Sequence, residues 1–146
     1  MADLRPILVV EDNPKDLELT LAALAKCQLA NDIHVARDGA EALDYLFRRG
    51  SFADRFVGDP AVVLLDLKLP KVNGLQVLER MRATEATKRL PVVVFTSSSE
   101  EEDMIRSYDL GANSYVRKPV DFEHFSEATR NLGMYWLLLN QPAPTD

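Results

Sequence analysis

Short apolar runs alternate with segments of helical spacing along the chain. The runs show no regular polar and apolar alternation, which favours strands that are buried on both faces of a sheet. An alternation of such strands with helices predicts a parallel sheet covered by helices on both sides. The expected strands are residues 7–10, 33–36, 61–66, 92–95 and 114–117.

Helix-starting signals follow the expected strands. Asn13 offers a capping amide directly before Pro14, which suits a first helical turn. Ser99, with Glu102 three residues later, has the spacing of a capping box, and Asp121 is expected to cap the last helix. The expected helices are 14–28, a segment between Asp38-Gly39 and Arg48, about 74–84, 99–110, and the segment that follows Asp121.

Five strands that alternate with five helices predict an α/β fold. We expect a flavodoxin-like (βα)5 doubly wound sheet with strand order 2-1-3-4-5 and helices on both faces. In this order the topological switch point lies between the first and third strands. We find no internal repeat, so we expect a single domain over residues 1–146, with a core of about 5–139 and a short tail, 140–146.

Polar side chains of a particular kind stand where the expected strands end. Glu11 and Asp12 follow the first strand, Asp66 ends the third, Thr96 follows the fourth, and Lys118 follows the fifth. Because the carboxyl ends of parallel strands meet at one edge of the sheet, these side chains are expected to converge. Three acids, a hydroxyl and an ammonium group indicate a site for a metal ion and a phosphoryl group.

Composition excludes several classes of protein. The net charge of −6 argues against a nucleic-acid surface, which needs a basic stripe. The single cysteine, Cys27, can form no internal disulfide. No stretch approaches the roughly 20 apolar residues of a membrane span, and residues 1–6 lack the apolar core of a secretory signal. We expect a cytoplasmic protein whose partners are neither nucleic acid nor membrane.

The motifs at the strand ends resemble those of the receiver domain of bacterial response regulators. The resemblance is ordered along the chain and covers residues 5–139. Any one motif is weak, whereas all of them at the matching strand ends are specific. They are Val10-Glu11-Asp12-Asn13, Leu65-Asp66-Leu67-Lys68-Leu69-Pro70 with Asn73-Gly74, Thr96-Ser97, and Lys118-Pro119.

Finer features resemble the stand-alone response regulators that partner bacterial and cyanobacterial phytochrome histidine kinases. These features are the segment 117–122, the long connection 48–60 and the tail 135–142. The resemblance implies a two-component signalling protein whose partner is a sensor histidine kinase, specifically a bacteriophytochrome. Since no DNA-binding or catalytic domain is attached, output is expected to pass through a separate partner.

The resemblance implies that Asp66 accepts a phosphoryl group from a phosphohistidine of the kinase. Thr96 and Lys118 are then expected to bind the phosphoryl oxygens. The implied protein catalyses its own phosphorylation and dephosphorylation and is not a conventional multi-turnover enzyme. Its implied cofactor is Mg²⁺, for which Mn²⁺ can substitute, and the implied ligands are Glu11, Asp12, Asp66 and the backbone carbonyl of Lys68.

The resemblance also assigns a switch and a control of lifetime. Thr96 is expected to shift toward the phosphoryl group while Tyr115 turns inward, which alters the surface of the fourth helix, fifth strand and fifth helix. Lys68 and Ser98 each lie two residues after a site residue. They are expected to screen the attacking water and so to tune the lifetime of the phosphorylated state.

The last helix carries more apolar side chains than one buried face requires. A single stripe with spacings of three and four is expected to face the core, and it comprises Phe122, Phe125, Thr129, Leu132, Trp136 and Leu139. Tyr135, Leu137 and Leu138 fall outside this stripe. We therefore expect a homodimer through the last helix and the tail, and the alternative is contact with the connection 48–60.

The residues at the strand ends also bear on three other functions. A flavin-binding protein of this fold would need a hydroxyl- and glycine-rich phosphate loop where residues 11–14 stand. A phosphatase of the haloacid dehalogenase type would need a second aspartate at the position of Lys68. The remaining alternative is a pseudo-receiver, an interaction module that is not phosphorylated, and the presence of all five site residues argues against it.

Overall fold

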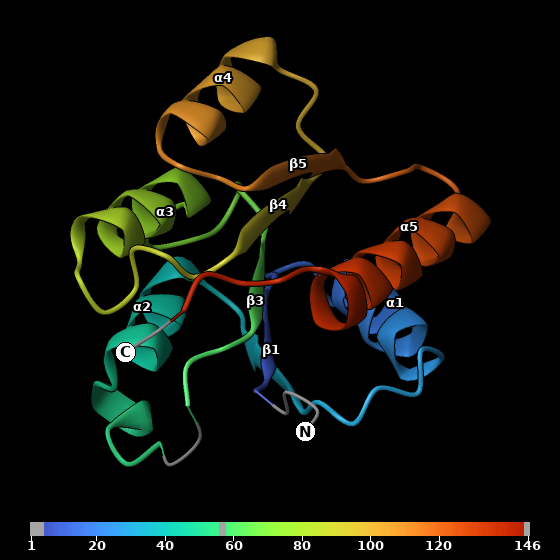
Figure 1. Cartoon of the computed structure of the whole chain (residues 1–146). Helices are drawn as coiled ribbons and strands as arrows, with labels where there is room; N and C mark the ends of the chain where they lie inside the picture. Colours follow the sequence, from blue (N-terminus) through green and yellow to red (C-terminus); the bar gives the residue numbers. More distant parts are fainter. Residues whose placement is uncertain (1–4, 56–57, 145–146) are drawn as a thin grey trace.

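Five parallel strands form a single sheet in the order β2-β1-β3-β4-β5 (Figure 1). The computed structural model describes residues 5–55 and 58–144, so predictions that fall on residues 1–4, 56–57 and 145–146 lie outside the described part. The flavodoxin-like fold and its strand order are confirmed. The strands are β1 (Ile7–Val10), β2 (Ile33–Ala36), β3 (Val62–Leu65), β4 (Val92–Thr96) and β5 (Ser114–Arg117).

Five α-helices connect or follow the strands, and capping side chains start four of them. Asn13, Asp38, Asn73 and Asp121 each accept a hydrogen bond from a backbone N–H of the first turn, which satisfies donors that lack an intrahelical partner. Within the described ranges, no helix has the length and apolar content to cross a membrane. The helices are α1 (Pro14–Ala25), α2 (Gly39–Phe47), α3 (Gly74–Ala83), α4 (Glu101–Asp109) and α5 (Phe122–Met134).

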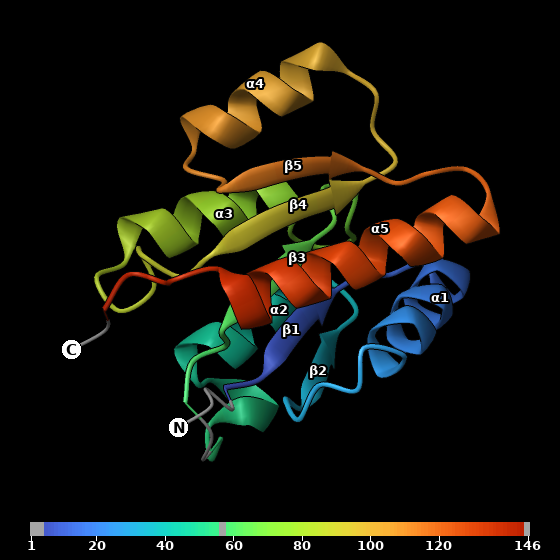
Figure 2. The ribbon, with the colours of Figure 1, turned by 45° about the vertical axis from the view of Figure 1, so that its right-hand side comes forward.

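Two apolar layers enclose the sheet. Figures 1 and 2 show α1 and α5 side by side on one face, with α2 and α3 on the other. The first face buries Leu17 and Leu24 of α1 against Val9 of β1, and the second buries Leu78 and Met81 of α3. The central strands β1, β3 and β4 are therefore covered on both sides, which explains their continuous apolar runs, whereas the edge strands β2 and β5 are only partly buried.

Two predicted helix boundaries were wrong. The first helix ends at Ala25 rather than at 28, and Gln28 adopts a positive φ of 54°. The predicted capping box of Ser99 and Glu102 does not form, because α4 begins at Glu101 and its cap residue, Glu100, makes no side-chain capping bond. Instead, the Glu100 backbone N–H donates to the hydroxyl oxygen of Ser98 at 3.3 Å.

The predicted stripe of the last helix is broken at both ends. Phe122 is 58% exposed and Leu139 is 69% exposed, although both were expected to face the core. At the carboxyl end the cause is a π-helical turn, η2 (Tyr135–Leu139), which contains more residues per turn than an α-helix. The wider turn shifts the side chains, so Leu137 packs against the core together with Trp136.

Candidate functional site

The Asp66 carboxylate lies at the carboxyl end of β3, and two neighbouring strands supply its partners. Thr96, the last residue of β4, donates its hydroxyl hydrogen to Oδ1 at 2.8 Å. Lys118, directly after β5, donates from Nζ to Oδ2 at 2.8 Å. All three side chains are buried. The strand ends therefore bring a carboxylate, a hydroxyl and an ammonium group together, as the sequence predicts.

The Lys118 ammonium group contacts three carboxylates. Besides Asp66, it donates to Oε1 of Glu11 and, at 2.9 Å, to Oδ2 of Asp16. The Lys118 backbone N–H also donates to the carbonyl of Thr96 at 2.7 Å, which fixes the start of the side chain at the sheet edge. Burial alone would lower the pKa of Lys118. The hydrogen bond and charge of Asp66, together with the hydrogen bonds to Glu11 and Asp16, outweigh this effect, so the pKa is raised above its usual value and the ammonium stays charged.

An acidic trio, Glu11, Asp12 and Asp66, can offer ligand oxygens that all lie within 4.8 Å of one another. Burial of Glu11, with a smaller contribution from the charge of Asp66, raises the pKa of Glu11 to about 7 against the opposing hydrogen bond from Lys118. Several hard oxygen donors in a partly buried position suit a divalent cation such as Mg²⁺ or Mn²⁺, whose charge would offset their repulsion. The donor set therefore fits a metal ion.

Gly74 lets α3 start close to the acidic trio. A Cβ atom at this position would lie 2.2 Å from the carbonyl oxygen of Asp66, so any larger residue would push the helix away from the site. The Gly74 N–H donates to the carbonyl of Leu67 at 2.9 Å, which closes the loop after β3. The Asn73-Gly74 pair thus sets the shape of the loop that carries Asp66.

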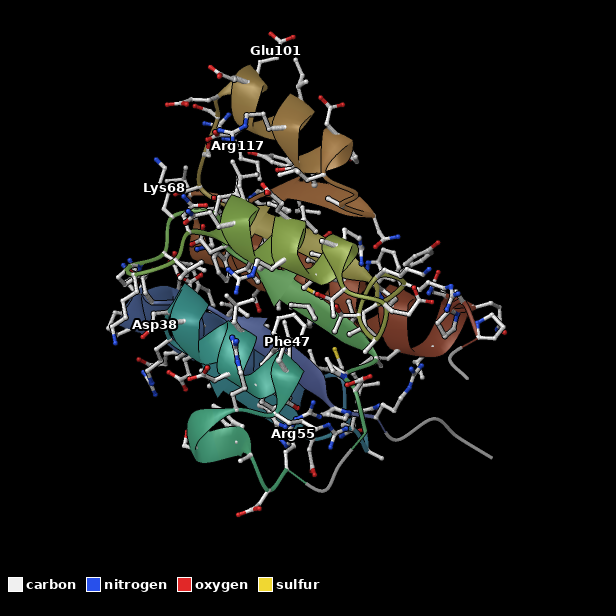
Figure 3. All side chains as sticks on the ribbon, turned by 90° about the vertical axis from the view of Figure 1, so that its left-hand side faces the viewer. Asp38, Phe47, Arg55, Lys68, Glu101 and Arg117 are labelled. Carbon is white, nitrogen blue, oxygen red and sulfur yellow. The ribbon has the colours of Figure 1, made fainter. Side chains whose placement is uncertain are left out.

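The two residues expected to tune lifetime occupy different surroundings. Lys68 is exposed and extends from the loop after β3 at the edge of the molecule (Figure 3), while its backbone N–H donates to Oδ1 of Asp66 at 3.3 Å. Ser98 is buried, and its hydroxyl donates to Oδ2 of Asp103 at 2.6 Å rather than facing Asp66. Ser98 therefore connects the loop after β4 to the first turn of α4.

The backbone of Ser98 forms hydrogen bonds with the side chains of both Tyr115 and Thr96. The half-buried Tyr115 donates its hydroxyl hydrogen to the Ser98 carbonyl at 3.2 Å. The Ser98 N–H donates to the Thr96 hydroxyl oxygen at 3.3 Å. A chain of hydrogen bonds thus runs from Asp66 through Thr96 and Ser98 to Tyr115 and to α4.

The residues expected to form a dimer lie away from this site, at the far end of α5. Tyr135 is 49% exposed and Leu138 is 60% exposed, whereas Leu137 is partly buried against the core. Leu137 and Leu138 also border a cavity of about 390 Å³ that includes Arg5 and Ala61, near the amino ends of β1 and β3.

Two contributors to the site were missed by sequence reasoning. Asp16 stands four residues after Asp12, one helical turn into α1, and the sequence reading stopped at the strand ends. Asp103 lies in the acidic run Glu100-Glu101-Glu102-Asp103, which the positive amino end of a solvent-exposed helix is enough to explain. The spacing from Asp12 is a signal that could have indicated Asp16, but no sequence signal pairs Asp103 with Ser98.

Solved response regulators of phytochrome systems are similar to this chain over nearly its whole length. The phosphorylated cyanobacterial phytochrome response regulator RcpA is 34% identical, with a TM-score of 0.91, and the match covers 97% of this chain and 100% of RcpA. The bacteriophytochrome response regulator AtBRR is 61% identical, with a TM-score of 0.76, over 95% of this chain and 99% of AtBRR.

The response regulator Rcp1 of Synechocystis sp. is 34% identical over 90% of this chain and 88% of Rcp1. Its Mn²⁺-bound form has a TM-score of 0.89, at 31% identity over 96% of this chain and 99% of that structure. Residues 7–130 match the family model described as the response regulator receiver domain. The fold and the convergence of the strand-end side chains agree with this match. The chain therefore belongs to the response regulator receiver domain family.

Proposed function

We propose that Asp66 accepts a phosphoryl group from a phosphohistidine of a sensor histidine kinase, and that this kinase is a phytochrome. The observation that carries the proposal is that the two oxygens of the Asp66 carboxylate have different partners. One accepts a hydrogen bond from the Thr96 hydroxyl and the other from the Lys118 ammonium. Similarity to RcpA, which was solved in its phosphorylated form, and to AtBRR supports both parts.

In the proposed transfer, an oxygen of Asp66 forms a bond to phosphorus while the bond between phosphorus and the histidine nitrogen breaks. The leaving imidazole takes up a proton from solvent, and Asp66 becomes an acyl phosphate. The new group brings a charge of about −2 at pH 7. Lys118 offsets this charge, and Thr96 donates its hydroxyl hydrogen to a phosphoryl oxygen. Attack of water on phosphorus then breaks its bond to the Asp66 oxygen, releases inorganic phosphate and returns the free carboxylate. In this proposal the chain catalyses both steps on itself.

The acidic trio would hold Mg²⁺, with the backbone carbonyl of Lys68 as a further ligand and Mn²⁺ as a substitute metal. When bound, Mg²⁺ supplies positive charge that reduces the repulsion between a carboxylate and the phosphoryl oxygens. The proximity of the three carboxylates supports this role. The Mn²⁺-bound form of Rcp1 supports it as well.

The signal would leave the site through the hydrogen-bond chain that includes Thr96, Ser98 and Tyr115. When Thr96 turns toward a phosphoryl oxygen, its bond from the Ser98 N–H changes, and with it the positions of Tyr115 and of α4. The altered surface comprises α4, β5 and α5. Lys68, at the exposed mouth of the site, and Ser98, behind Thr96, would set how long the acyl phosphate survives.

The carboxyl end of α5 and the following tail would form a homodimer. Exposed apolar side chains here, Tyr135 and Leu138, lie far from Asp66 and are not needed for the core. Leu137 contributes less than expected from the sequence, because part of its surface already contacts the chain's own core.

Phosphorylation of the purified chain by phosphoramidate tests the proposal. In the presence of Mg²⁺, intact mass should increase by one phosphoryl group in the wild type and not in Asp66→Asn. Asp109→Asn, on the exposed side of α4, is a matched control and should be phosphorylated normally. Failure of the folded wild type to gain mass, both with phosphoramidate and with a phosphorylated kinase, would overturn the proposal and favour the pseudo-receiver alternative.

A further inference from the structure

Asp16 is the partner of Lys118 whose role the strand-end motifs do not explain. It lies in the first turn of α1, and its Oδ2 accepts a hydrogen bond from Lys118 Nζ at 2.9 Å. The Lys118 side chain is only 4% exposed and the Asp16 side chain 26% exposed, so the pair sits where the buried site meets its rim. A charge-assisted bond in this position is shielded from most of the solvent.

Asp16 is itself held firmly by the start of α1. Its backbone N–H donates to Oδ1 of Asn13, the cap residue of the helix, at 3.0 Å. A negative charge in the first helical turn is also favoured by the helix dipole. The carboxylate can therefore act as a fixed point for a long and flexible lysine side chain.

The three carboxylate partners of Lys118 divide into two groups. Glu11 and Asp66 belong to the acidic trio, whereas Asp16 does not. If a metal ion engages the trio and Asp66 carries a phosphoryl group, the contacts of Lys118 with Glu11 and Asp66 must both change. The contact with Asp16 is the one that can persist through the whole reaction.

We infer that Asp16 is a positioning residue, which holds one N–H of the Lys118 ammonium so that the other two stay directed at the phosphoryl group on Asp66. An ammonium group has three donors, and fixing one of them limits the orientations of the other two. This inference rests on the proposed phosphorylation of Asp66. It assigns Asp16 no contact with the phosphoryl group, and its effect on the reaction passes through Lys118.

The test compares Asp16→Ala, which loses the acceptor, with Asp16→Asn, which keeps an acceptor oxygen without the charge. Glu18→Ala, an exposed acid of the same helix, is the matched control. At saturating phosphoramidate and Mg²⁺, we expect Asp16→Ala to lower the rate constant for phosphorylation by about tenfold, because an ill-placed cation no longer meets the developing charge. Asp16→Asn should restore most of this rate, and Glu18→Ala should match the wild type.

A second measurement reports on Lys118 directly. The ¹⁵N-edited NMR signal of a lysine ammonium group persists when its hydrogens are held in hydrogen bonds, and the Lys118 signal can be assigned by its loss in Lys118→Arg. We expect the signal to broaden or vanish in Asp16→Ala with Mg²⁺ present and to return in Asp16→Asn. Thermal melting confirms that each variant is folded.

The outcomes separate the two proposals. Wild-type rates in Asp16→Ala, together with an unchanged Lys118 signal, would overturn the role of Asp16 while leaving phosphorylation of Asp66 intact. A faster rate in Asp16→Ala would also overturn it, since that result would mean that Asp16 restrains Lys118. If the wild type is not phosphorylated but its Lys118 signal depends on Asp16, the proposed function fails and the positioning contact remains.

Discussion

At the scale of single residues, the site works by giving each oxygen of Asp66 a different partner. Oδ1 accepts from Thr96 and from the Lys68 N–H, whereas Oδ2 accepts from Lys118. A carboxylate held in this way has one preferred orientation, so the proposed attack on phosphorus would need little reorganisation. The same hydroxyl and ammonium groups would then receive the charge of the phosphoryl group.

The hydroxyl of Thr96 is therefore expected to matter more than the bulk of the side chain. Thr96→Ala removes the donor and should lower the rate constant for phosphorylation by about tenfold or more, by analogy with loss of one preorganised donor. Thr96→Ser keeps the donor and should recover most of the rate. Ser97→Ala, which removes an exposed neighbouring hydroxyl, is the control for the intact-mass assay. Equal rates in Thr96→Ala and the wild type would contradict the role of the hydroxyl.

The sequence predicts the residues at the strand ends because topology alone brings them together. Asp66 and Lys118 directly follow parallel strands and Thr96 ends one, so their meeting needs only the strand order. The contact between Asp16 and Lys118 joins residues 102 positions apart and depends on how α1 packs beside the end of β5. The spacing from Asp12 places Asp16 one helical turn from the site, but the sequence does not identify Lys118 as its partner, because that contact depends on tertiary packing.

At the scale of elements, α4 is the helix held least by apolar packing. Among its residues only Ser107 is fully buried, while Met104, Ile105 and Tyr108 remain largely exposed. The bond between Ser98 and Asp103 fastens its first turn to the loop after Thr96. A helix secured chiefly by polar contacts can change position when one of those contacts is exchanged.

Loss of the Asp103 carboxylate should loosen the start of α4. In Asp103→Ala we expect faster amide hydrogen exchange over residues 101–104 before phosphorylation, and a smaller further change after it. Glu102→Ala, at an exposed position in the same turn, should leave exchange close to that of the wild type. Exchange mass spectrometry measures both, and protection of α4 that is equal in Asp103→Ala and wild type would contradict the coupling.

Element boundaries were less predictable than element order. The helix periodicity placed α1, α2 and α3 correctly to within a few residues, because their buried faces follow the α-helical repeat. That repeat does not anticipate the π-helical turn of η2, which moved Leu139 outward and Leu137 inward. A turn of this kind arises from packing against the rest of the chain rather than from local spacing.

At the scale of the whole molecule, α5 links two separate surfaces. Its cap residue, Asp121, stands three residues after Lys118, and its other end passes into η2 beside the amino ends of the strands. Figure 2 shows the helix extending along the full face of the sheet next to α1. A change at the proposed phosphorylation site and the proposed contact at the tail could therefore influence each other through this one helix.

The proposed homodimer should be weakened by a charge at the centre of the exposed apolar surface. Leu138→Glu is expected to raise the dissociation constant of the dimer by at least about tenfold, because a buried carboxylate without a partner is costly. Ile105→Glu changes an equally exposed apolar residue of α4 and should leave the oligomeric state unchanged. Size exclusion with light scattering measures both variants, and a monomeric wild type at high concentration would exclude the dimer.

The buried hydrogen-bonding groups around Asp66 are all paired in this structure. Within the described residues, every fully buried side-chain nitrogen or oxygen has a partner. A phosphoryl group on Asp66 would therefore replace existing partners rather than fill vacancies. Switching would then be an exchange between two fully bonded arrangements, and the free energy of that exchange would set the fraction of molecules in the active arrangement.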